Sequence, residues 1–156
     1  MKRSKVLISF FLTCLITTFA FANQTVKQTE PNKEATKMKF LIHITHGPEH
    51  PTRAALGFLI AKTAIEEGHT VTLFLAGDAV QLMRDAVLDN LTGLGTGKLR
   101  EHYDAIVKGG GKFYLSGMSS KSRGLTEADL KGKPAVFSPP NVLLKLSLES
   151  DRMFTY

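Results

Sequence analysis

Residues 109–120 read GGGKFYLSGMSS and predict the end of one helix, a short buried strand and a tight turn. The three glycines can adopt positive φ, so they end the helix that precedes them. Residues 113–115 are strand formers in a run that is too short for a helix. Ser116 and Gly117 follow at once and are expected at the carboxyl end of this strand. In an open α/β sheet ligands bind at that edge, so the stretch predicts both a fold class and the position of a site.

Apolar runs and helical patterns alternate on both sides of this stretch. Strands are expected at 38–44, 70–76, 113–115, 133–137 and 152–156, and helices at 52–67, 79–88, 98–108, a short segment from Thr126 and a longer one from Pro139-Pro140. Residues 90–97 are expected to form a glycine-rich loop, and composition alone would also allow a strand at 142–148. Near-continuous apolar strands that alternate with helices are typical of a parallel sheet covered on both faces. The sequence therefore predicts a single α/β domain with a mostly parallel five-stranded sheet flanked by helices.

The first 22 residues have the composition of an export signal. Positive residues lie within 2–5, an apolar run follows over 6–21, and Ala20-Phe21-Ala22 is a small-residue cleavage pattern. We expect cleavage after Ala22, and hence a periplasmic or secreted protein that no longer contacts the membrane. The alternative is an uncleaved membrane anchor. The run fits an anchor poorly, because it is shorter than the ~20 apolar residues of a membrane span and contains Ser and Thr.

The part of the chain that follows the expected signal is mildly basic and lacks cysteine. Removing residues 1–22 lowers Lys plus Arg from 20 to 17 while Asp plus Glu stays at 14, so the net charge falls from +6 to +3. This small charge, without a basic stripe interleaved with aromatic residues, argues against nucleic-acid binding. Cys14 lies within the signal, so no thiol remains for a disulfide, a thiolate metal site or a persulfide. Residues 23–37 are polar and are expected to form a flexible linker before a folded domain at 38–156.

Four segments of the expected domain resemble the DsrE/DsrF-like family, whose members act in bacterial sulfur relays. The segments are MKFLIHITHGPEHPTRA (38–54), VTLFLAGDAV (71–80), GGKFYLSGMSSKSRGL (110–125) and DRMFTY (151–156). The resemblance implies a five-stranded parallel sheet of flavodoxin-like character, and homo-oligomers that are often trimers or hexamers. It also implies a pocket at the end of the strand before the Gly-x-Ser turn. The sulfur-carrying members have a cysteine there, and this sequence has Ser116.

The serine at this position decides how much of the family's function carries over. Sulfur transfer requires a thiolate that attacks and then holds a second sulfur atom, which a hydroxyl cannot do. We therefore expect an exported, non-catalytic protein that binds a small molecule or a protein partner at the Ser116 pocket, as an accessory to sulfur or redox metabolism. Two alternatives stay open. One is a hydrolase or transferase that uses His46 and Ser116, and the other is an oligomeric scaffold whose pocket is vestigial.

Polar residues that follow the expected strands form the candidate ligand-binding set. The set comprises His46, Glu49, His50, Arg53, Asp78, Ser116, Gly117, Ser119 and Arg123. Three of these residues have structural alternatives. Asp78 is equally well placed to cap a helix, Arg53 to pair with a surface carboxylate, and Arg123, with Lys121, to lie in a solvated loop.

The same motifs predict no resident metal and no cofactor. Three histidines and Glu49 gather around the first turn, but one of them, His43, lies inside a strand, so the residue types alone do not imply a metal site. Ser116 lacks the Gly-x-Ser-x-Gly elbow of a hydrolase. The glycine loop at 92–98 fails the phosphate-loop pattern at both ends. Residues 45–49 lack the Ser/Thr-rich phosphate loop of a flavodoxin, which argues against a flavin.

Overall fold

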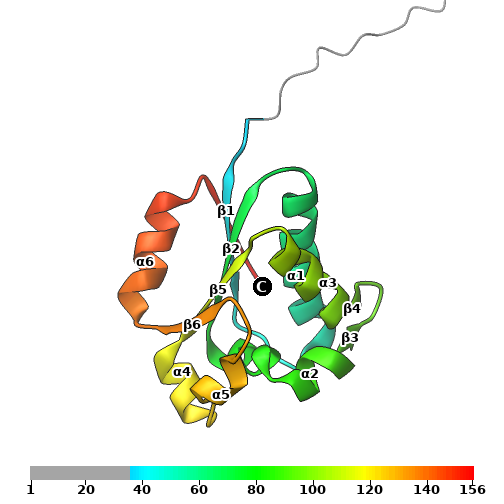
Figure 1. Cartoon of the computed structure of the whole chain (residues 1–156), viewed down its shortest axis with the longest axis vertical. Coiled ribbons are helices and arrows are strands. Elements are labelled where there is room, and N and C mark those ends of the chain that lie inside the picture. The colour runs from blue at the N-terminus through cyan, green and yellow to red at the C-terminus, as the bar shows by residue number, and fades with distance from the viewer. Residues whose placement is uncertain (1–35) are drawn as a thin grey trace, which may run out of the picture. The chain divides into compact units, whose positions relative to one another are not determined.

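The computed structural model describes residues 36–156 as an α/β fold, which confirms the predicted class (Figure 1). Five strands form one sheet in the order β6-β5-β2-β1-β7, and every neighbouring pair is parallel. The strands are β1 Lys39–Ile44, β2 Thr70–Leu75, β5 Lys112–Ser116, β6 Ala135–Ser138 and β7 Arg152–Thr155. The α-helices are α1 Pro51–Glu66, α2 Asp85–Asn90, α3 Leu99–Lys108, α4 Gly117–Ser122, α5 Glu127–Leu130 and α6 Pro140–Glu149. Residues 1–35, with the expected export signal and most of the expected linker, lie outside the described residues.

The main hydrophobic core lies between the sheet and the helices α1 and α3, which cover the same side (Figure 1). Phe58 of α1 and Tyr103 of α3 both pack against Phe113 of β5, with ring centroids 5.8 and 5.2 Å apart. Burial of each such ring contributes roughly 2–3 kcal/mol to folding. The helix α1 approaches the sheet closely because Gly57 has no side chain. A Cβ atom at Gly57 would lie 2.6 Å from Cδ1 of Ile44.

The opposite side of the sheet, which we call the α6 face, is covered less completely. Its centre is closed, since Leu41 of β1 and Phe74 of β2 are buried. The helix α6 lies over this side (Figure 1), but none of its own residues is buried. Exposed apolar side chains on α6 and on the edge strands of this face are Val136, Leu144, Leu148 and Met153. The two faces of the sheet therefore differ in how well this single chain protects them from water.

The expected helix at 79–88 is divided in two. The first part is a 3₁₀ helix, η1 Gly77–Met83, and the second is α2, with Arg84 between them in an extended conformation. The guanidinium of Arg84 donates a hydrogen bond of 2.7 Å to the carbonyl oxygen of Arg123 and lies 3.6 Å from the carboxylate of Asp129. The break thus brings Arg84 to partners 39 and more residues further along the chain, which a local helical pattern does not reveal.

Three other segments complete the comparison with the sequence. The expected loop at 90–97 contains a small antiparallel hairpin of β3 Thr92–Gly93 and β4 Gly97–Lys98. The Leu94 N–H in this hairpin donates to the Thr52 hydroxyl of α1 at 3.0 Å, a long-range contact that holds the hairpin on the helix. Residues 142–148 are helical within α6, so the alternative of a strand is wrong. Residues 117–120, expected as a turn, begin α4 instead.

Candidate functional site

The loops that follow β1, β2 and β5 meet at one edge of the sheet, because these strands are parallel. Gly47, in the loop after β1, packs against the backbone of Asp78 in η1, where a Cβ atom would collide with the Asp78 carbonyl oxygen. The Gly47 N–H donates to Oε1 of Glu49 at 2.7 Å and holds the loop in a tight turn before α1. The close fit of the two loops therefore depends on the absence of a side chain at Gly47.

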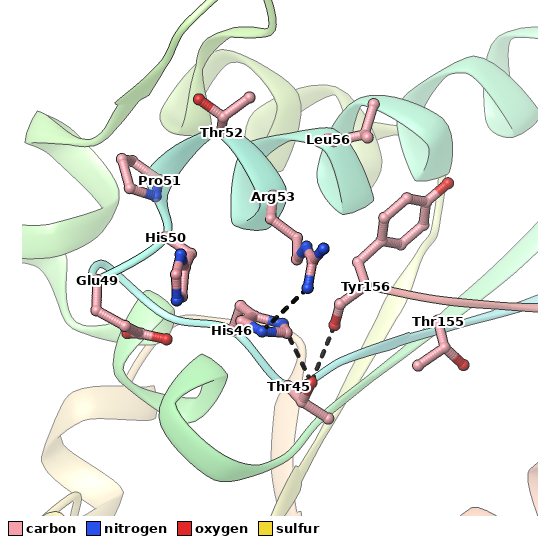
Figure 2. Close-up of a pocket in the computed structure, with 10 residues that line it drawn as sticks. All are labelled: Thr45, His46, Glu49, His50, Pro51, Thr52, Arg53, Leu56, Thr155 and Tyr156. Carbon is pink, nitrogen blue, oxygen red and sulfur yellow. Dashed lines mark hydrogen bonds between the residues drawn. The ribbon is translucent and has the colours of Figure 1, made fainter.

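A cavity of about 690 Å³ opens beside the loop after β1 and the first turns of α1 (Figure 2). It is lined by Thr45, His46, Glu49, His50, Pro51, Thr52, Arg53, Leu56, Thr155 and Tyr156. Four predicted ligand-binding residues, namely His46, Glu49, His50 and Arg53, are thus brought together around one space. We call it the β1–α1 cavity.

Hydrogen bonds across the floor of this cavity orient His46. Nη1 of Arg53 lies 3.2 Å from Nε2 of His46, and Nδ1 of His46 lies 3.3 Å from the Thr45 hydroxyl (Figure 2). The hydroxyl donates in turn to the carbonyl oxygen of Tyr156 at 3.1 Å. A guanidinium can only donate, so Nε2 of His46 accepts and the ring proton belongs on Nδ1. His46 is therefore neutral, and its Nε2 atom accepts the hydrogen bond from Arg53.

The start of α1 adds a second histidine to the cavity. His50 is the residue that precedes the helix, and its side chain makes no capping hydrogen bond to the first turn. Pro51 is the first helical residue, a position that tolerates proline because its N–H would have no intrahelical partner. The His50 ring packs edge-on against His46, with centroids 5.0 Å apart. The two imidazoles therefore form one wall of the cavity.

The remaining predicted residues form a separate group, which we call the Ser116 cluster: Asp78, Ser116, Ser119 and Arg123. The Ser116 hydroxyl accepts a hydrogen bond of 3.3 Å from the Ser119 N–H and so caps α4. The Ser119 hydroxyl accepts from the Gly77 N–H at 3.0 Å, which ties α4 to η1. Nε of Arg123 donates to Oδ1 of Asp78 at 2.7 Å. The polar groups of this cluster bond mainly to one another.

Asp78 is held in its charged form by this arrangement. The hydrogen bond from Arg123 lowers the pKa of Asp78 below its usual value, the positive charge of Arg123 acts in the same direction, and burial opposes them. The alternative of Asp78 as a simple helix cap is not what the structure contains, since η1 begins after Ala76 without a side-chain cap.

The chemistry available to Ser116 is limited by its surroundings. Among residues 36–156 its hydroxyl bonds to the Ser119 N–H, and neither a histidine nor a carboxylate forms a hydrogen bond with it. A serine hydroxyl without a base is a weak nucleophile. Ser116 is not part of the lining of the β1–α1 cavity, so a ligand at Ser116 stays a prediction. A Cβ atom at Gly117, the first residue of α4, would lie 3.6 Å from the Ser138 carbonyl oxygen, which is an ordinary van der Waals contact.

His43 does not join the other two histidines. It lies on the strand β1, where burial lowers the pKa of its ring, and its Nε2 is buried without a hydrogen-bond partner among the described residues. Its ring meets that of Phe74 edge-on at 6.0 Å, on the α6 face. Within residues 36–156 no three or more His, Cys, Asp or Glu side chains are arranged to hold a metal ion.

The cavity also contains residues that the sequence analysis did not select. Tyr156 reaches it because β7 pairs with β1, which brings the Thr45 N–H within 2.8 Å of the Tyr156 carbonyl oxygen. Leu56 reaches it from α1, one helical turn beyond Thr52. The helical spacing of Leu56 was visible in the sequence, but the pairing partner of the last strand was not.

Comparison with known proteins agrees with this fold. The model of the DsrE/DsrF-like family matches residues 38–156. The chain belongs to the DsrE/DsrF-like family. No curated protein matches this DsrE-like chain. Among solved structures, the ychN protein from E. coli is 15% identical with a TM-score of 0.61, over 76% of this chain and 99% of that one. BT1422, a conserved protein of unknown function from Bacteroides thetaiotaomicron, is 10% identical with a TM-score of 0.56, over 76% and 95%. At these identities the likeness concerns the fold alone.

The ion pair in the Ser116 cluster should make the DsrE-like fold sensitive to acid. A carboxyl group whose pKa is lower in the folded than in the unfolded chain stabilises the fold above its unfolded pKa, which for Asp is 3.8. That stability is lost as the pH falls through the folded pKa. The melting temperature of Asp78→Asn should therefore fall less than that of the wild type between about pH 5 and pH 2. The difference should be modest, because the pair is partly exposed.

Arg123→Gln provides the control for this measurement, since it removes the partner and leaves the carboxylate. The melting temperature of Arg123→Gln should also fall less with acid than that of the wild type. In the double variant the reduction of this fall should be no larger than in either single variant. Additive effects in the double variant would show that the two residues do not act as a pair.

Proposed function

We propose that this DsrE-like protein is an exported, non-catalytic binding protein that holds a small molecule in the β1–α1 cavity. The observation that carries the proposal is the meeting of His46, His50 and Arg53 with an apolar wall in one space of about 690 Å³. Cavities of this size with a few convergent polar groups are typical of small-molecule sites. Family membership supports a role as an accessory to sulfur or redox metabolism.

Two properties of the chain argue against sulfur transfer. Cys14 is the only cysteine and lies within the expected signal, so the folded domain carries no thiol. Ser116 is at the position of the family's cysteine, and its hydroxyl oxygen caps the N-terminus of α4. We therefore favour the β1–α1 cavity over Ser116 as the ligand site, because its histidines and Arg53 face open space while the Ser116 cluster is bonded internally.

A screen for ligands by thermal shift tests this proposal. Compounds that raise the melting temperature of the wild type are tested again on His50→Ala and Ser116→Ala. We expect His50→Ala to weaken binding about tenfold, which removes about 1.4 kcal/mol of ligand stabilisation. Ser116→Ala should keep the full ligand response, since its oxygen caps α4 and lies outside the cavity.

The other results of this screen discriminate the alternatives. A ligand response that Ser116→Ala abolishes and His50→Ala preserves would move the site to Ser116. Chemical conversion of a bound compound would favour the enzyme that uses His46 and Ser116. A screen in which no compound raises the melting temperature would favour the oligomeric scaffold with a vestigial pocket.

The family resemblance implies homo-oligomers, and we also propose that copies of this chain associate through the α6 face. Leu144 and Leu148 stand one turn apart on α6 and are 67% and 87% exposed. Leucines that remain in water on a half-covered sheet face are typical of a protein interface. A trimer or hexamer in which a second copy covers this face would explain why α6 buries none of its own residues.

Light scattering after size exclusion tests the assembly. The double change Leu144→Lys and Leu148→Lys should reduce the mass from that of a trimer or hexamer to that of one chain, because it places charges in the interface. Leu94→Lys is the matched control, since Leu94 is 88% exposed at the tip of the β3–β4 hairpin, on the other side of the sheet (Figure 1). A wild type with the mass of one chain would refute the proposal.

Export completes the proposal and concerns residues outside the described part of the chain. Its basis is the positive start, the apolar run and the small-residue pattern that ends at Ala22. The mass of the purified protein should correspond to a chain that begins at Asn23, and a mass that includes residues 1–22 would favour the anchor. Within residues 36–156 every helix is too short or too polar to span a membrane.

A further inference from the structure

We infer that the ligand of the β1–α1 cavity is a small organic anion, whose charged group binds Arg53 and whose body lies against Leu56 and Tyr156. The inference rests on the proposed function, since it names the chemical class of that ligand. It follows from the lack of a counter-ion for Arg53 among the described residues, from the position of the acidic side chain in the lining and from the size of the cavity.

Arg53 is a cation without a counter-ion in the described part of the chain. No carboxylate of residues 36–156 lies within ion-pair distance of it, and its side-chain hydrogen bond goes to the neutral His46 through Nη1. A guanidinium carries five N–H donors, so several donors remain for a ligand. The contrast with Arg123, at the same edge of the sheet, is informative. Arg123 donates to Asp78 at 2.7 Å and is thus already neutralised.

The acidic side chain in the cavity lining does not compete for this charge. Glu49 bonds to the Gly47 N–H through Oε1 at 2.7 Å, within its own loop. In Figure 2 the rings of His46 and His50 lie between Glu49 and Arg53. The carboxylate of Glu49 is therefore engaged within its own loop, and in this view the two histidine rings separate it from the positive charge of Arg53.

The rest of the lining fits an organic body better than a bare ion. A volume of about 690 Å³ is many times that of one water molecule, so a lone oxyanion would fill little of it. Leu56 and the Tyr156 ring lie beside Arg53 and form an apolar wall (Figure 2). The Tyr156 phenol is uncharged at neutral pH, and burial raises its pKa further. An anion that carries a flat or aliphatic group therefore meets both a charge and an apolar surface.

The experiment compares anions with neutral molecules of the same shape on the purified chain. The probes are aromatic and aliphatic carboxylates, sulfonates and phosphate monoesters, each paired with its neutral amide or alcohol, for example benzoate with benzamide. Binding is followed by amide NMR shifts at His46, Arg53 and Tyr156. We expect at least one anion to bind in the cavity with a dissociation constant at least tenfold lower than that of its neutral counterpart.

Arg53→Gln should remove this tenfold preference, and Arg152→Gln should retain it. Arg152 is a suitable control because it lies at the opposite end of β7 from the cavity and donates to the Asp151 carbonyl oxygen. A melting temperature of Arg53→Gln close to that of the wild type excludes unfolding as the cause of lost binding.

The possible failures separate this inference from the proposed function. Neutral molecules that shift the cavity residues as strongly as their anions would overturn the inference and leave the binding function intact. An anion preference that persists in Arg53→Gln would overturn the role of Arg53. The absence of cavity shifts with every probe would overturn both the inference and the proposed function.

Discussion

The parallel pairing of β1 with β2 on one side and β7 on the other is the constraint on which the rest of the structure depends. Parallel strands must be joined by crossover connections, so their carboxyl ends all point to the same edge of the sheet. This single rule brings the loop after β1, the start of η1 and the end of β7 into contact. Gly47 then allows the first two of these to meet, because any side chain there would collide with the backbone of Asp78.

The shared edge is divided into a closed part and an open part. In the closed part, Ser116, Ser119, Asp78 and Arg123 satisfy one another's charges and hydrogen bonds and join α4 to η1. In the open part, Arg53 bonds to a neutral histidine and faces the β1–α1 cavity. Two arginines at the same edge of the sheet thus have different roles, and the difference lies in whether a carboxylate is within ion-pair distance.

The sheet itself is also asymmetric. On one side, α1 and α3 bring aromatic and aliphatic side chains into a continuous core with Phe113 at its centre. On the other side, α6 lies over a sheet face on which Leu41 and Phe74 are buried, but it leaves leucines of its own in water. A sheet in a doubly wound fold normally buries both faces, since both carry apolar strand residues. The incomplete α6 face is therefore the natural place to look for contacts beyond one chain.

The sequence by itself determined the class of the fold, the order of the strands along the chain and the position of four of the ten residues that line the candidate site. It could do so because buried parallel strands are continuous apolar runs, and because Gly110, with a φ of +80°, ends α3 where the glycine run predicted. The short helix that was expected from Thr126 depends on an equally local pattern, the capping box that Thr126 forms with Asp129. His46, His50 and Arg53 are close in sequence to the end of β1, so their proximity in space followed from that strand alone.

Only the tertiary structure decided which partners those residues have. The break at Arg84, the hairpin held by Thr52 and the bond from Gly77 to Ser119 all depend on groups that lie far apart in the sequence. Tyr156 enters the cavity through the pairing of the last strand with the first, across more than a hundred residues of chain. Local propensities report which element a segment forms. The contacts between elements depend on how the whole chain packs, and these contacts close the Ser116 cluster and leave the β1–α1 cavity open.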